Sequence, residues 1–182
     1  MSFAGYASRN HPFYTGGVRD SVDDRSTPDS VFGPLHDRYG FTIDVAAADH
    51  NAKLPRYFTA EQNGLAQSWA TEVVWCNPPF SRLRPWVGKA WREHRTAAGI
   101  VMLVPATRTE QDWWQDLVEP YRDRPGSPLR TEFLPGRPRF LYRGQLPSAK
   151  GDRPMFGCVL LIWEPTPVPA EQMLLSFDGD PA

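Results

Sequence analysis

Short apolar runs alternate along the chain with segments of helical periodicity, which is the pattern of an α/β fold. The apolar runs, each typical of a strand, are residues 41–47, 73–76, 98–106, 130–134 and 155–163. The run AGIVMLVPA at 98–106 has no alternating polar residues, and this predicts a strand in a mostly parallel sheet covered on both faces. Apolar spacing predicts flanking helices at 28–39, 81–95 and 110–118.

The first predicted helix carries its own start and stop signals. Thr27 is expected as the N-cap, Pro28 at the first helical position, and Gly40 as the stop. Residues 48–72 follow without a sustained pattern, so they are expected to hold at most one short helix or strand.

The other segments indicate one domain with two polar ends. Residues 1–26 lack periodicity and predict a flexible N-terminal arm, residues 27–165 a single domain, and residues 166–182 a C-terminal tail. Within the domain, residues 135–154 are basic and rich in Gly and Pro, which predicts a projecting loop or hairpin.

Composition narrows the function classes. With 182 residues, 41% of them apolar and 23% charged, the chain fits one folded domain. Its 20 Lys and Arg nearly balance 21 Asp and Glu, so any contact with nucleic acid has to come from local basic patches. Cys76 and Cys158 have neither a disulfide-framework nor a zinc-site spacing. No apolar stretch is long enough for a membrane span and residues 1–17 do not resemble a signal peptide, so we expect a cytoplasmic protein.

The most informative motif is Asn77-Pro78-Pro79-Phe80, directly after the apolar run VVWC. The carboxyl ends of strands in an open α/β sheet form the ligand crevice. There the Asn77 carboxamide oxygen and the Pro78 carbonyl can accept hydrogen bonds from one amino group, while Phe80 offers an aromatic face to a planar ring. The motif therefore predicts a site for an amino-bearing base, although an Asn-Pro-Pro turn can also simply end a strand.

This motif resembles that of amino-directed methyltransferases that use S-adenosylmethionine, and its surroundings resemble the phage and prophage DNA N6-adenine methyltransferases of Dam type. The segments that carry the resemblance are Thr27-Pro28, 43–47, 51–53, 57–59, Trp69, 75–81, 101–106 with Trp113, and Gly136-Arg137 with Phe140. The resemblance implies a compact Rossmann-like fold that binds S-adenosyl-L-methionine and methylates adenine in DNA. Asn77, Pro78, Pro79 and Phe80 are its implied catalytic residues, with Phe80 stacked on a flipped base. The alternatives are a glutamine-directed protein methyltransferase of the same fold and an inactive DNA-binding or cofactor-binding module.

The resemblance also implies a set of cofactor-binding residues. They are Thr27, Pro28, Asp44, Ala46, Asn63 and Asn77. Asp44 would receive the ammonium group of the cofactor, which explains an acid within an apolar run. Two alternatives stay open: Asp44 can pair with a core Arg, and Thr27 can be only a helix cap.

Two features depart from the general methyltransferase pattern. The Gly-rich turn expected after the first strand is replaced by Ala46-Ala47-Ala48, and only the 26 residues 47–72 lie between the end of that strand and VVWC. This is too short for two further strands with their helices, so we expect a reduced sheet. The ribose-binding acid is either Asp49 or Glu61.

Basic residues near the motif and in the 135–154 loop are the candidates for DNA contact. They are Arg82, Arg84, Arg137, Arg139 and Arg143. Arginines in the loop can read guanine edges in the major groove. Those of the 81–95 helix, with Arg92 and Arg95, can instead form a solvated helix face.

Overall fold

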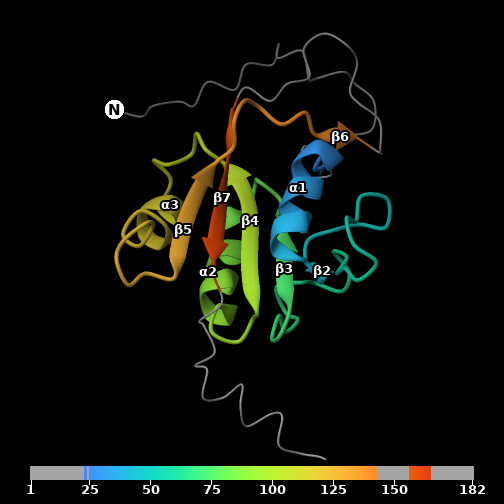
Figure 1. Ribbon diagram of the computed structural model, residues 1–182, viewed down its shortest axis with the longest axis horizontal. Helices are drawn as coiled ribbons and strands as arrows, with labels where there is room; N and C mark the ends of the chain where they lie inside the picture. Colours follow the sequence, from blue (N-terminus) through green and yellow to red (C-terminus); the bar gives the residue numbers. More distant parts are fainter. Residues whose placement is uncertain (1–22, 24, 143–155, 165–182) are drawn as a thin grey trace, which may run out of the picture.

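The computed structural model describes residues 23, 25–142 and 156–164 (Figure 1). A five-stranded sheet has the order β2-β3-β4-β7-β5. Its strands are β2 (Ile43–Asp44), β3 (Val73–Cys76), β4 (Gly99–Pro105), β5 (Leu129–Phe133) and β7 (Cys158–Trp163). The helices are α1 (Asp29–Tyr39), α2 (Leu83–Glu93) and α3 (Asp112–Leu117). The predicted α/β class and the alternation of strands and helices are confirmed.

The expectation of a mostly parallel sheet needs correction, because the sheet is mixed. β3 is parallel to β2 and to β4, whereas β7 is antiparallel to both of its neighbours, β4 and β5. The apolar run of β4 predicts burial on both faces, and every residue of β4 and of β7 is buried. Burial on both faces is common in parallel sheets but depends on the covering layers, so it does not by itself determine strand direction.

Helices cover both faces of the sheet, as Figure 1 shows. On one face, α2 and α3 bury a cluster that includes Val74, Met102 and Leu161. On the other face, α1 packs Phe32 and Leu35 over the alternate strand residues, Trp75 among them. Successive strand residues point to opposite faces, so the unbroken apolar runs supply both cores at once.

The start of α1 differs from the prediction by one residue. Pro28 is the N-cap, with extended backbone (φ −65°, ψ 147°), and Asp29 is the first helical residue. Thr27 therefore lies before the cap, and its side chain does not cap the helix. The stop is confirmed: Gly40 is left-handed (φ 64°) and its N–H donates to the His36 carbonyl.

One short strand lies where the sequence predicts an arm, and another lies within the predicted loop or hairpin. β1 (Arg25–Ser26) pairs antiparallel with β6 (Leu141–Tyr142). We call this pair the β1–β6 ribbon. Each strand has only two residues, below the length at which an apolar pattern is recognisable in a sequence. The part of the expected loop at 143–154 lies outside the described residues.

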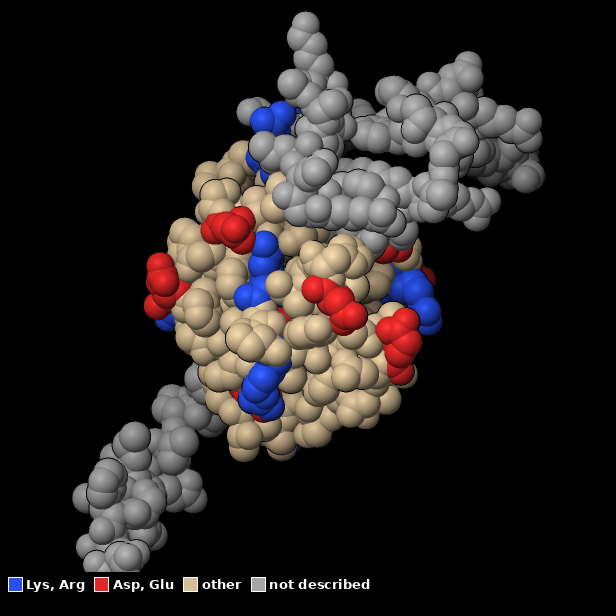
Figure 2. Space-filling view, turned by 90° about the vertical axis from the view of Figure 1, so that its right-hand side faces the viewer, with Lys and Arg blue, Asp and Glu red and all other residues tan. Residues whose placement is uncertain are grey.

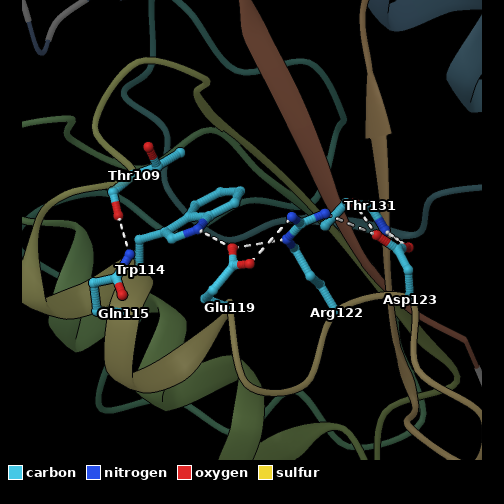
Figure 3. Close-up of polar contacts among 7 residues, drawn as sticks. All are labelled: Thr109, Trp114, Gln115, Glu119, Arg122, Asp123 and Thr131. Atoms are coloured by element: carbon cyan, nitrogen blue, oxygen red, sulfur yellow. Dashed lines mark hydrogen bonds and ion pairs between the residues drawn. The ribbon is translucent and has the colours of Figure 1, made fainter.

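A polar network ties α3 to the edge strand β5, as Figure 3 shows. Glu119 accepts hydrogen bonds from the Trp114 indole (2.8 Å) and from Arg122 Nε (2.9 Å). The Asp123 carboxylate then accepts from both the backbone N–H (2.7 Å) and the hydroxyl of Thr131 in β5. The network holds the chain between α3 and β5 far from the carboxyl ends of β2 and β3, so we assign it a structural role. Among the described residues, no helix is long and apolar enough to cross a membrane.

Candidate active site

The carboxyl ends of β2 and β3 bring the two most informative polar residues to one edge of the sheet. Asp44 is the last residue of β2 and pairs in register with Trp75, while Asn77 directly follows β3. Because these strands are parallel neighbours, their ends lie side by side. The crevice expected at strand ends is thus where the candidate residues meet.

A small cavity at this edge is lined by four of the six predicted cofactor residues. Its lining comprises Asp23, Ser26, Thr27, Asp44, Ala46, Asn51, Lys53, Trp75 and Asn77. The cavity volume is about 20 Å³, close to the space that one water-sized group occupies. It fits a small cationic head group and is too small for a whole nucleoside.

Asp44 is the electrostatic centre of the cavity. Its side chain is buried, and its two oxygens accept hydrogen bonds from the backbone N–H groups of Ala46 (3.3 Å) and Lys53 (3.1 Å). Burial disfavours the charged form and raises the pKa of Asp44 to about 6, although the two backbone donors and the Lys53 charge lower it. Lys53 Nζ itself pairs with Asp29 at 2.7 Å. Among the described residues, no arginine pairs with Asp44.

Thr27 adds an unsatisfied hydroxyl to the same cavity. The residue is 1% exposed, and its Oγ1 has no hydrogen-bond partner within the described ranges. A buried polar atom without a partner costs free energy, and a ligand that hydrogen-bonds to it removes that cost. Among the described residues, no cation is paired with the Asp44 carboxylate or the Thr27 hydroxyl. Their oxygens together form a set of hydrogen-bond acceptors that suits an ammonium group.

The turn that carries Asn77 is held by contacts at its far end. Pro78 is buried, and the Phe80 ring packs edge-on against Phe140 (5.8 Å between centroids) and Phe156 (5.9 Å). Arg108, in the loop after β4, donates from Nη1 to the Phe80 carbonyl at 2.7 Å. The catalytic residues predicted at 77–80 are therefore in one short, well-contacted turn at the sheet edge.

Two predicted cofactor residues are not brought into the cavity. Pro28 is buried as the α1 cap and borders a different groove, beside α1. Asn63 is exposed and has a left-handed backbone (φ 54°) in a turn whose next residue, Gly64, packs against the Val45 carbonyl. A Cβ at Gly64 would lie 2.1 Å from that oxygen, so this close approach requires glycine.

The two candidate ribose acids differ in their surroundings. Asp49 accepts a hydrogen bond from the Tyr57 hydroxyl at 3.1 Å, and both line an open hollow of about 370 Å³ beside β2. Glu61 is exposed, and hydrogen bonds within its own turn lower its pKa. The hollow favours Asp49, and the choice between them remains a prediction.

The candidate DNA-contact residues are divided between two places. Arg137 and Arg139 line a groove of about 570 Å³ between α1 and residues 132–139. Arg84 of α2 is paired with Asp116 of α3 at 2.8 Å, and Arg82 is exposed where α2 begins. Arg143 lies outside the described residues.

On the face beyond β2, the described residues form no basic patch. Figure 2 shows acidic and basic side chains interspersed there, with neither sign forming a continuous area. Close ion pairs such as Arg56–Glu72 explain why the charges alternate. This face offers no concentrated attraction for phosphate.

Several residues at the site were missed by the sequence analysis. Asp23 and Ser26 were placed in the expected arm, and Asn51, Lys53 and Arg108 had no assigned role. Asn51 Oδ1 accepts the Ala48 N–H at 2.6 Å and so shapes the loop that follows Asp44. An Asn shortly after a strand end is a turn signal, and this was the one available indication in the sequence.

Comparisons with known proteins place the chain in a family. A family model described as DNA N-6-adenine-methyltransferase (Dam) matches residues 17–123. A DNA N-6-adenine-methyltransferase of Escherichia phage T1 is 38% identical over 90 residues, which are 48% of this chain and 38% of the relative. One of Haemophilus phage HP1 is 40% identical over 50 residues, 28% of this chain and 29% of the relative. The putative methyltransferase YfdM of Escherichia coli K12 is 32% identical over 85 residues, 43% of this chain and 87% of the relative. The chain thus spans less than half the length of the two phage relatives it matches.

Proposed function

The chain belongs to the DNA N-6-adenine-methyltransferase (Dam) family, and from that premise we propose that it transfers a methyl group from S-adenosylmethionine to the N6 amino group of adenine in DNA. The sheet would then be a reduced Rossmann-like methyltransferase fold in a domain spanning residues 27–165. Matches to phage relatives support action on DNA in the cytoplasm of a bacterial host.

One observation carries the proposal: Thr27, Asp44, Ala46 and Asn77 line a single cavity at the carboxyl edge of the sheet. These residues come from three segments far apart in the chain. Buried polar groups in folded proteins usually have a hydrogen-bond partner, so the Thr27 hydroxyl beside these strand ends has no obvious structural purpose. A ligand with an ammonium group accounts for the Asp44 carboxylate, for Asn77 and for the Thr27 hydroxyl.

The cavity residues would hold the amino-acid end of the cofactor. Asp44 would bind the ammonium group, and the Thr27 hydroxyl would hydrogen-bond at the same end. When bound, S-adenosylmethionine supplies an electrophilic methyl group, which passes to N6 as the carbon–sulfur bond breaks, with S-adenosylhomocysteine as leaving group and one N6 proton released to solvent. The adenosine part exceeds the volume of this cavity and would lie outside it, with Asp49 or Glu61 as the ribose acid.

The catalytic turn would hold the target base. The Asn77 amide oxygen and the Pro78 carbonyl accept hydrogen bonds from the N6 amino group, which draws the nitrogen lone pair out of conjugation with the ring. Phe80 stacks on the base after it leaves the duplex. The contribution of these residues is therefore positioning and hydrogen bonding, without a covalent enzyme intermediate.

The DNA would be held by basic residues near the turn. Arg137 and Arg139 are the first candidates because they line one groove beside α1. Arg82 lies at the end of the catalytic turn, whereas the ion pair between Arg84 and Asp116 makes Arg84 the weaker candidate. The family match ends at Asp123, so the groove arginines are supported by their placement and by the resemblance of the Gly136-Arg137 segment.

A methyl-transfer assay tests the proposal. Purified protein is incubated with labelled S-adenosylmethionine and separate pools of duplex DNA, RNA and protein, with Asn77→Ala as the inactive control. We expect label in DNA as N6-methyladenine. Label only in the protein pool would identify a glutamine-directed protein methyltransferase instead. DNA binding without any turnover would identify an inactive binding module.

A further inference from the structure

Asp23 is linked to the catalytic turn by two hydrogen bonds. Its Oδ1 accepts the Ser81 backbone N–H at 3.1 Å, and its Oδ2 accepts the Ser81 hydroxyl at 2.5 Å. Ser81 directly follows Phe80, and 58 positions separate it from Asp23 in the chain. Both carboxylate oxygens are thus used on a single residue of the turn.

Asp23 adds hydrogen bonds that tie the turn to a distant segment of the chain. Pro78 and Pro79 have no N–H to donate. Beyond the prolines, the hydrogen bonds of the turn include the Arg82 N–H to the Pro79 carbonyl (3.0 Å), the Arg108 contact with the Phe80 carbonyl and the Ser81 contacts with Asp23. The bond to Pro79 lies within the turn, whereas Arg108 and Asp23 tie the turn to other parts of the chain.

The β1–β6 ribbon connects Asp23 to a second contact with the same turn. Asp23 lies two residues before β1, and β1 pairs with β6. Phe140, directly before β6, packs against the Phe80 ring. The residues next to the ribbon thus contact the turn twice. The Asp23 carboxylate contacts Ser81, and the Phe140 ring contacts Phe80. Asp23 also lines the cavity that contains Asp44 and Asn77, so it lies at the site itself.

We propose that Asp23 is a positioning residue that holds the 77–81 turn in the orientation needed for methyl transfer. This rests on the proposed function. The role is to fix the direction of the Asn77 and Pro78 acceptors through Ser81, on which both Asp23 carboxylate oxygens are used. Misplacement of reacting groups by about 1 Å can lower a rate on the order of 100-fold, so loss of this restraint affects turnover more than binding.

The test uses the full chain with Asp23→Ala and Asp23→Asn. The Asp23→Ala variant is expected to lower kcat for methylation of unmethylated genomic DNA by about 10-fold or more, with KM for DNA changed by no more than about 3-fold. The Asp23→Asn variant keeps an acceptor oxygen of the same shape, and it is expected to retain kcat within about 3-fold of the wild type. The matched control is Asp37→Asn, an exposed acid on α1, which is expected to behave as wild type.

A double-mutant cycle tests whether Asp23 acts through Ser81. Ser81→Ala removes only the hydroxyl, so its effect on kcat is expected to be smaller than that of Asp23→Ala. The combined variant is expected to lose no more activity than Asp23→Ala alone, because both changes break the same link. A combined loss equal to the product of the two single losses would overturn the proposal.

A direct measurement separates this proposal from the proposed function. Hydrogen–deuterium exchange of residues 77–82 is expected to be faster in Asp23→Ala than in the wild type, whether or not the protein methylates DNA. Wild-type kcat or unchanged exchange in Asp23→Ala would overturn the positioning role. Binding of S-adenosylhomocysteine that weakens about 10-fold or more in both Asp23 variants would also overturn it, because Asp23 would then be a ligand. If Asp23→Ala fails to fold, Asp23→Asn decides, and kcat more than about 10-fold below wild type refutes the proposal.

Discussion

Replacement of Asp44 by Asn tests whether this buried acid binds a ligand although its charge lowers the stability of the folded protein. Asp44 is 3% exposed, and burial raises its pKa from an ordinary value of 3.8 to about 6. The folded state therefore binds more protons than the unfolded state between these two values. By linkage, the free energy of unfolding falls as the pH rises through this window.

The magnitude follows from the two pKa values. At pH 7 the difference between 3.8 and about 6, at 1.36 kcal/mol per pH unit, amounts to about 3 kcal/mol of destabilisation by the charged carboxylate. An asparagine amide avoids this cost. It has one acceptor oxygen in place of two, so one of the backbone donors at Ala46 and Lys53 loses its partner, at roughly 1 kcal/mol. We expect Asp44→Asn to be more stable than the wild type by about 2 kcal/mol at pH 7.

Urea unfolding of both proteins at pH 7 and pH 4.5 measures this difference. Other titrating groups are common to both proteins, so they cancel when the two unfolding free energies are subtracted. At pH 4.5 the folded wild type is mostly protonated at Asp44, and the advantage of the variant should shrink by about 2 kcal/mol. A difference that does not vary with pH, or a variant less stable than the wild type at pH 7, would refute the reasoning.

The same substitution should damage binding. A neutral amide cannot compensate a buried ammonium group, so the affinity for S-adenosylmethionine is expected to fall on the order of 100-fold. Isothermal titration calorimetry at pH 7 measures this. A more stable protein with unchanged affinity would show that Asp44 is not the ammonium ligand, while its burial cost would still stand.

Four other changes probe the catalytic turn, the groove and the edge strand. Asn77→Ala should lower turnover on the order of 100-fold or more with nearly unchanged cofactor affinity, and full activity in the labelled-methyl assay would make the motif structural. Phe80→Ala should weaken DNA binding by about 1 to 3 kcal/mol in a fluorescence anisotropy titration, whereas Phe80→Tyr should be tolerated. Arg137→Ala combined with Arg139→Ala should reduce the slope of log affinity against log salt by about 0.9 for each DNA phosphate that the variant no longer neutralises, and a folded variant with the wild-type slope would exclude the groove. Asp123→Ala should lower the free energy of unfolding by roughly 2 kcal/mol, since it removes two hydrogen bonds to β5, and urea unfolding with no change would exclude the anchoring role.

Much of the fold follows from local pattern in the chain. The runs that form β3, β4 and β7 have enough consecutive apolar residues to predict strands, and their burial is as expected. Gly40 ends α1 because a left-handed residue is needed at that point. The position of Asn77 is equally local, because the prolines after it stop the strand.

Strand direction could not be predicted in the same way. β7 has the same apolar character as β4 but runs antiparallel to it. The direction of β7 depends on the connection that precedes it in the chain, and the residues of β7 themselves do not indicate that direction. The two-residue strands of the β1–β6 ribbon are likewise too short to leave a recognisable pattern in the sequence.

The candidate site also combines residues that the sequence indicates with residues that only the packing of the chain brings together. The sequence by itself determined which residue types can do the chemistry, because Asn77 at a strand end and Asp44 within an apolar run are unusual in any context. Only the tertiary structure decided that Asp23 joins them, while Asn63 stays outside the cavity. The physical reason is that a cavity is formed by parallel strand ends and by the segment that crosses them, and contacts over such distances in the chain arise from packing of the whole sheet rather than from local preference.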